Sequence, residues 1–266
     1  MTNWNGHGRH TTLPNNKEMI EAVFKWIQRL DDYPGWKKWN TQRFNRTLLD
    51  DDWLTDEERE PLGDFTFSDD MERQYDVAFQ YLGLHQTVHV LSDCEFYFRR
   101  FPFHGLPISY SDHITNICEM YFGRFYEFRE RLKNYLNALD RALPSHRIEI
   151  GRFIKSFDKE FDSELRARNS VHHHQRFKDQ AIDRVFLAHA LSTTPSGLSW
   201  KKERERAYRK LTREWVVRVR NRAAKVEEFL DATSTFALAN CSFLSSDANA
   251  PASATANQAG APGEKA

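Results

Sequence analysis

Residues 111–142 read SDHITNICEMYFGRFYEFRERLKNYLNALDRA, and their apolar side chains recur at alternating spacings of four and three. The recurring positions are Ile114, Cys118, Tyr121, Phe125, Phe128, Leu132, Tyr135 and Leu139. This spacing places them on one stripe of an α-helix, where they pack against a partner. Pro107 precedes the stretch, Pro144 follows it, and Ser111 or Asp112 is expected to cap it. The stretch therefore predicts a long packed helix.

The same periodicity predicts helices on both sides of this stretch. A helix over about 69–100 comes first, and the short turn with Pro102 and Gly105 makes the two helices antiparallel neighbours. Further helical segments are expected at about 16–31, 146–170, 176–191 and 199–238. The sequence lacks alternating β-branched runs and Asn-Gly hairpins, which are typical of strands. We therefore predict an all-α fold, a multi-helix bundle with long antiparallel helices.

Three parts of the chain differ in composition. Residues 1–69 are expected to form one helix and an irregular acidic segment on the body. Four aromatic residues of that segment are its expected anchors: Tyr33, Trp36, Trp39 and Trp53. Residues 70–240 are expected to form the bundle. Residues 241–266 end in a run rich in Ala, Ser, Pro and Gly, which predicts a disordered tail.

The formal charge is balanced overall but is segregated along the chain. Lys and Arg together number 38, as do Asp and Glu, so net charge gives no case for a nucleic-acid or membrane protein. Residues 50–72 hold 11 acidic side chains and one basic, while residues 199–225 hold 11 basic and three acidic. A basic helix suits a polyanion such as RNA. The alternatives are a solvated face, or pairing of the two segments within the fold.

The cysteines and the apolar runs predict a protein of the cytoplasm. Cys94 and Cys118 lie inside apolar stripes and are expected to be buried free thiols, and Cys241 completes no metal-binding spacing. The N-terminus lacks the apolar stretch of a signal peptide. No apolar run reaches the roughly 20 residues of a membrane span. We expect no membrane contact and no cofactor.

A cationic side chain interrupts one apolar seam. Phe157, Phe161 and Leu165 mark one helix face, and Arg168 follows Phe161 by seven residues, almost two turns. The pattern therefore predicts a guanidinium in a core position, where a cation needs a partner. Residues 168–174 read RNSVHHH. An arginine beside a histidine can hold a phosphate and move a proton.

This pattern resembles the signature of the HEPN superfamily, in which Arg is followed after four to six residues by His and often directly by Asn. Arg168 and Asn169 match it, with His173 or His174 at the permitted spacing, whereas His172 comes one residue early. The resemblance implies a helical bundle over about 70–240 that acts as a metal-independent endoribonuclease. It also implies a homodimer, a role in toxin–antitoxin or antiviral defence, and a cognate antitoxin or defence-system partner.

The resemblance assigns roles to individual side chains. His173, or else His174, takes or gives the proton, with His172 in support, while Arg168 grips the scissile phosphate and Asn169 orients a neighbour or the phosphate. Glu164, one turn before Arg168, either fixes its guanidinium or forms an ordinary surface ion pair with it. The whole cluster also has a plain alternative, the polar end of a helix.

Three other pairs have the same Arg-to-His spacing: Arg99 and His104, Arg141 and His146, and Arg184 and His189. The first two pairs cross a proline, and the third lies within one helix, where a spacing of five residues places the side chains on different faces. Arg168 alone continues an apolar seam, precedes Asn and opens into a histidine run. Arg166 is expected to face solvent.

Two further hypotheses come from other segments. Arg206, Arg209 and Arg213 lie in the basic helix and are expected to bind an RNA backbone, with Tyr208 as a stacking residue and Trp215 as a core residue. A bundle that binds a partner without catalysis is therefore one alternative.

The other alternative is a metal-dependent bundle enzyme. His85, His89 and Asp93 recur every four residues on one helix face. Satisfied boundary histidines are the plainer interpretation of this spacing.

Overall fold

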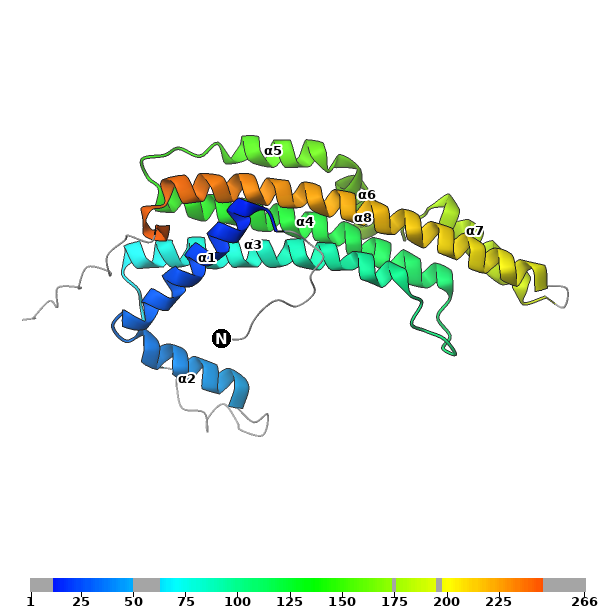
Figure 1. Cartoon of the computed structure of the whole chain (residues 1–266), viewed down its shortest axis with the longest axis horizontal. Coiled ribbons are helices and arrows are strands. Elements are labelled where there is room, and N and C mark those ends of the chain that lie inside the picture. Colours follow the sequence, from blue (N-terminus) through cyan, green and yellow to red (C-terminus); the bar gives the residue numbers. More distant parts are fainter. Residues whose placement is uncertain (1–11, 50–62, 174–175, 195–197, 246–266) are drawn as a thin grey trace, which may run out of the picture.

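The computed structural model describes residues 12–49, 63–173, 176–194 and 198–245. Every regular element in these ranges is helical, which confirms the predicted all-α bundle. Three long helices form its frame: α3 (Asp69–Arg99), α4 (Tyr110–Ala142) and α8 (Leu198–Asn240). They run side by side along the long axis of the molecule (Figure 1). None of the described helices is both long and apolar enough to cross a bilayer.

The α3–α4 pair forms where its periodicity predicts it. Ser68 caps α3 by accepting a hydrogen bond from the Met71 amide, and Ser109 caps α4 by accepting one from the Asp112 amide at 3.0 Å. The expected cap at Ser111 or Asp112 is therefore wrong by two or three residues. Gly105 lies in the turn between the helices with a φ of +79°, a conformation that glycine adopts without strain.

One continuous core joins the three long helices. The apolar stripe of α4 is buried along its whole length, as its spacing predicts. Phe98 of α3 stacks on Trp215 of α8, with ring centroids 5.3 Å apart and planes 10° apart. Cys94 and Cys118 are buried free thiols, as expected, and Cys241 is a third buried free thiol.

The N-terminal part is more regular than its sequence predicts. Helix α1 (Pro14–Arg29) packs across α3 and α8, and a 3-10 turn, η1 (Leu30–Asp32), follows it. The expected irregular segment contains a helix, α2 (Trp36–Leu49), so that prediction is wrong for these residues. The aromatic anchors hold for the described part: Trp36 is buried and stacks on Phe67, and Tyr33 and Trp39 pack on Phe65. Trp53 lies outside the described residues.

The predicted single helix over 146–170 is wrong. The structure has two helices here, α5 (Ile150–Glu160) and α6 (Asp162–His173). Between them Phe161 has a φ of −111° and a ψ of 24°, which are not helical values. The helix is therefore interrupted at Phe161, seven residues before Arg168.

The last two helices of the chain pack against each other, and a short turn follows the second of them. Helix α7 (Gln180–Ser192) packs on the N-terminal half of α8 at one end of the molecule (Figure 1). After α8 a 3-10 turn, η2 (Ser242–Leu244), returns to α1, and Cys241 and Leu244 are buried. Residues 241–245 therefore belong to the body, and the expected tail includes them wrongly. Residues 246–266 lie outside the described part.

Candidate functional site

Arg168 lies at the edge of the core. Its guanidinium carbon is 3.9 Å from the ring centroid of Tyr126 on α4, and its Nη1 donates a hydrogen bond to Asn169 Oδ1 at 3.2 Å. The predicted core position for Arg168 is wrong: its side chain is only half-buried, whereas Glu164, one turn earlier on the same face of α6, is buried. The side chains of His172 and His173, and the whole of His174, lie outside the described residues.

Glu164 is the buried charge of α6. Its carboxylate accepts hydrogen bonds from Arg218 at 3.1 Å and from Arg222 and Ser163 at 2.8 Å each. Burial alone raises the pKa of Glu164. The three hydrogen bonds together with the charge of Arg222 lower it by more than burial raises it, so the pKa lies below its ordinary value. The expectation that Glu164 fixes Arg168 is wrong, because two arginines of α8 occupy the carboxylate.

Arg168 differs from the other arginines that share its motif spacing. Each of those three has a carboxylate partner: Glu95 for Arg99 at 2.8 Å, Asp76 for Arg141 at 2.9 Å, and Glu203 for Arg184. Among the described residues no carboxylate pairs with Arg168, and its contacts are an aromatic face and a neutral amide. A guanidinium in this state keeps free donors for an anion. Arg166 pairs with Asp162 and is exposed, as expected.

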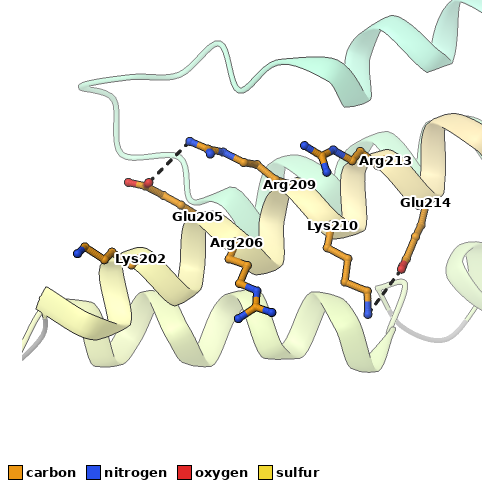
Figure 2. A pocket seen from close by; sticks show the side chains of 7 residues that line it. All are labelled: Lys202, Glu205, Arg206, Arg209, Lys210, Arg213 and Glu214. Carbon is orange, nitrogen blue, oxygen red and sulfur yellow. Dashed lines mark ion pairs between the residues drawn. The ribbon is translucent and has the colours of Figure 1, made fainter.

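A second basic feature lies on the outer face of α8. We call it the basic ridge, and it consists of Lys202, Arg206, Arg209, Lys210 and Arg213. Arg209 and Arg213 point to one side of the helix, and Arg206 and Lys210 to the other (Figure 2). All five side chains are exposed, because the core of α8 lies on the opposite face. The sequence prediction named three of them and missed Lys202 and Lys210, which share the same face.

The charge of the basic ridge is only partly neutralised. Glu205 lies 3.9 Å from Arg209, and Glu214 lies 3.8 Å from Lys210, both within α8 (Figure 2). Across the described ranges no carboxylate pairs with the remaining three cations, which are Lys202, Arg206 and Arg213. Exposed pairs at such distances are weak, about 0–1 kcal/mol each, so the ridge keeps a positive field.

The shape of the basic ridge suits a ligand that lies along the helix better than a small ligand enclosed in a pocket. Its side chains and the two glutamates line a depression of about 730 Å³. All of them belong to one helix, so the depression is space between long side chains on a convex surface. Tyr208 and Trp215 are buried. The prediction that Tyr208 stacks on bases is therefore wrong, whereas the core position of Trp215 is confirmed.

The two histidines of α3, His85 and His89, form a hydrogen bond with each other. The Nε2 atoms of His85 and His89 lie 3.2 Å apart, so one ring donates a hydrogen bond to the other. Burial, with a smaller contribution from His89, lowers the pKa of His85 to about 4. Within the described residues no group of three His, Cys, Asp or Glu side chains is placed to hold a metal ion. The structure therefore gives the His85, His89 and Asp93 site no support.

A second depression lies between the α4–α5 connection, α5 and the end of α8. Its volume is about 670 Å³, and Phe153 and Phe236 form part of its apolar lining. His146 and Arg147 lie at this depression, and the Nδ1 atom of His146 is 3.0 Å from Ser145 Oγ. Sequence reasoning set His146 aside because Pro144 separates it from Arg141. In the structure it lines the same depression as Arg147 and Arg152, so a test of catalysis by histidine includes a variant of His146 as a control.

Comparisons with known proteins leave the HEPN resemblance resting on the residues of this chain. The structure is an all-α bundle, an architecture that many unrelated helical proteins share. No protein-family model matches the chain, and neither the curated proteins nor the solved structures contain a match.

Proposed function

We propose that this protein binds RNA along the basic ridge of α8. One observation carries the proposal: five cations share the outer face of one helix, and three of them lack a carboxylate partner among the described residues. Cations that are not neutralised within the protein attract phosphates and release counterions when they bind them. The ion pairs of Arg209 and Lys210 are exposed and long, so a phosphate can replace the glutamate in each.

The length and shape of the basic ridge favour an extended polyanion. At 1.5 Å per residue, Lys202 and Arg213 are separated by about 16 Å along the helix axis. A small anion reaches one or two of these cations, whereas a polynucleotide backbone follows them all. RNA is the polyanion we propose, because the Arg168 motif resembles that of ribonucleases.

The test is a salt titration of RNA binding by fluorescence anisotropy. The double variant Arg206→Gln/Arg213→Gln is expected to lower the slope of log K against log salt by about 1.4, since each phosphate contact on a single strand contributes about 0.7. The control is Lys155→Gln/Lys159→Gln, which removes two exposed charges from α5 and should leave the slope unchanged. An equal slope in the ridge variant and the wild type would refute binding at the ridge.

A second candidate function is cleavage of the bound RNA by Arg168 and the histidine run. The observation that favours it is that Arg168, unlike Arg99, Arg141 and Arg184, has no carboxylate partner in the described part of the chain. Tyr126 and Asn169 hold its guanidinium in one orientation. An oriented, unpaired guanidinium is what a scissile phosphate requires.

The proposed reaction is an internal transesterification. The 2′-hydroxyl of the RNA attacks the adjacent phosphorus, and a histidine of the run, His173 or else His174, accepts its proton. The bond to the 5′-oxygen breaks, and that oxygen takes a proton from a solvent water, which leaves a 2′,3′-cyclic phosphate and a 5′-hydroxyl. Arg168 stabilises the charge on the phosphoryl oxygens. No metal takes part in these steps.

Cleavage is tested with purified protein, single-stranded RNA and EDTA. Arg168→Ala is expected to abolish cleavage while circular dichroism stays helical, and Arg166→Ala, two residues away and paired with Asp162, is the control. His173→Ala and His174→Ala identify the proton carrier, and His146→Ala controls for the second depression. Cleavage that survives Arg168→Ala rejects this mechanism, and cleavage that EDTA removes favours the metal alternative.

The cleavage proposal includes a homodimer and a regulatory partner. The resemblance implies that two copies of the motif line one cleft, and that an antitoxin or defence-system component controls it. Light scattering of the purified chain tests the first point: a dimer mass at assay concentration is expected. A protein that is fully active as a monomer removes the dimer from the proposal and leaves the chemistry intact.

A further inference from the structure

The cationic face of α8 continues beyond the basic ridge. Arg220 follows Arg213 by seven residues, almost two turns, so both lie on the same side of the helix. The guanidinium of Arg220 donates through Nε to Glu95 of α3, and Arg99 donates to the other oxygen of the same carboxylate at 2.8 Å. One glutamate therefore fixes two guanidiniums, one from each helix.

This cluster has an excess positive charge and outward donors. The side chain of Glu95 is 1% exposed, whereas those of Arg99 and Arg220 are 34% and 48% exposed. Each guanidinium has five N–H donors, and the carboxylate occupies only some of them. The buried glutamate thus orients two arginines without neutralising both, which leaves a site for one more anion at the surface.

A planar stack adjoins the two arginines. The guanidinium carbon of Arg99 lies 5.0 Å from the ring centroid of Phe96, and the Phe96 side chain is one of the exposed large apolar groups of the protein. Unpaired RNA bases stack on aromatic rings and on guanidinium planes. A base in a duplex is already stacked and paired, so it gains little from such a platform.

We infer that Glu95, Arg99 and Arg220, together with Phe96, form a subsite that holds one RNA phosphate and stacks one unpaired base. This inference rests on the RNA binding proposed above, and it names the substrate class as single-stranded. The subsite extends the binding path to about 27 Å from Lys202 to Arg220, at 1.5 Å per residue. Glu95 is a positioning residue, and the arginines and Phe96 make the contacts.

The charge of the subsite is tested with 5′-fluorescein-labelled oligouridine of 12 nucleotides. Arg99→Gln/Arg220→Gln removes the single phosphate contact of the subsite and is expected to lower the salt slope by about 0.7, so that between 50 and 200 mM salt the wild type loses about 2.6-fold more affinity than the variant. Arg99→Gln alone, which leaves Arg220 on Glu95 and so protects the fold, is expected to lower the slope by less than the double variant does, because Arg220 still contacts the phosphate. Lys155→Gln/Lys159→Gln is again the control.

The base contact is tested with Phe96→Ala. Affinity for the oligouridine is expected to fall by about fivefold or more, because stacking of one base contributes about 1–3 kcal/mol. Affinity for an abasic oligonucleotide of equal length, and for a paired RNA duplex, is expected to stay the same. Equal losses on all three probes would refute a stacking role, since the abasic strand and the duplex offer no unpaired base.

The outcomes separate this inference from the proposed function. Loss of binding in Arg206→Gln/Arg213→Gln, together with unchanged slopes in both Arg99 variants, overturns the subsite and leaves the ridge proposal standing. Unchanged binding in the ridge variant overturns the proposed function. A wild-type protein that binds no RNA overturns both. Tighter binding of the duplex than of the single strand overturns the assignment of the substrate class.

Discussion

Replacing Glu164 with glutamine removes the buried negative charge that two arginines of α8 share. The side chain of Glu164 is 2% exposed, whereas those of Arg218 and Arg222 are 39% and 22% exposed. Arg218 also lies over the ring of Trp215 at 4.7 Å, and Arg222 lies over Phe161 at 4.6 Å. The substitution keeps the shape of the side chain. It leaves Arg218 without a carboxylate among the described residues, and Arg222 with only the exposed Glu160.

The expected loss of stability is about 3 kcal/mol. Removing one partner of a fully buried ion pair costs about 3–5 kcal/mol. The lower end applies because both guanidiniums keep part of their hydration, and because the glutamine oxygen still accepts a hydrogen bond. At about 2–4 °C per kcal/mol for a protein of this size, the melting temperature falls by about 6–12 °C.

Urea unfolding at pH 7, followed by far-ultraviolet circular dichroism, measures this difference. The matched control is Glu160→Gln, because Glu160 pairs with the same Arg222 at 3.1 Å but is 43% exposed. Such a surface pair contributes about 0–1 kcal/mol. The expected result is a lower midpoint for Glu164→Gln, with an unchanged dependence on urea. Two variants that differ by less than about 1 kcal/mol would refute the view that burial of Glu164 makes its charge decisive.

The pH dependence of the same pair gives a second measure. The pKa of Glu164 is lower in the folded protein than in the unfolded chain, so its stabilisation is complete above the unfolded value of about 4.3. It is lost as the pH falls through the lower, folded value. The wild type and Glu164→Gln should therefore converge in stability below pH 4, and a constant difference down to pH 2 contradicts the assignment.

Two further predictions concern the core and the histidine pair. The hydroxyl of Tyr135 is buried without a hydrogen-bond partner among the described residues, so Tyr135→Phe should raise the free energy of unfolding by about 0.5–1 kcal/mol. Tyr81→Phe, which removes a hydroxyl bonded to Ser234 at 3.1 Å, should lower it by about 1 kcal/mol, and urea unfolding compares the two. The pKa of His85 should lie near 4 in a nuclear magnetic resonance titration and should rise in His89→Gln, because the second imidazole no longer opposes its protonation. A pKa of His85 at its ordinary value in the wild type, or the same pKa in the wild type and His89→Gln, would contradict this prediction.

The long helices were predictable because their signals are local. Each apolar position of α4 faces the core through its own spacing, and helix ends were predicted to within one or two residues of Tyr110 and Ala142. Serine caps and flanking prolines act over three or four residues, which is the range that sequence reasoning covers. The break at Phe161 has no such signal, because the apolar spacing of Phe157, Phe161 and Leu165 continues through it.

The partners of the buried Glu164, which follows this break, lie 54 and 58 residues further along the chain. Glu164 becomes buried because Arg218 and Arg222 on α8 meet it there, and neither partner is visible from the sequence around α6. The spacing from Phe161 places both Glu164 and Arg168 on one helix face, so it could not tell which of the two charges is buried. The pair Arg218 and Arg222, one turn apart, was the available signal, since two cations on the inner side of a helix require an anion opposite.

The basic character of α8 separates into three roles according to helix face. Arg218 and Arg222 turn inward to Glu164, and Arg220 turns toward Glu95 of α3. None of these partners belongs to the acidic segment 50–72. Residues 50–62 of that segment lie outside the described part of the chain, so its pairing with α8 stays a prediction. The cations of the basic ridge point outward and have no buried carboxylate partner among the described residues. A count of charges along the sequence cannot separate these outward cations from the inward ones. The polyanion hypothesis is consequently stronger for Lys202 to Arg213 than for Arg218 and Arg222, because the charge of that inward pair is used on Glu164.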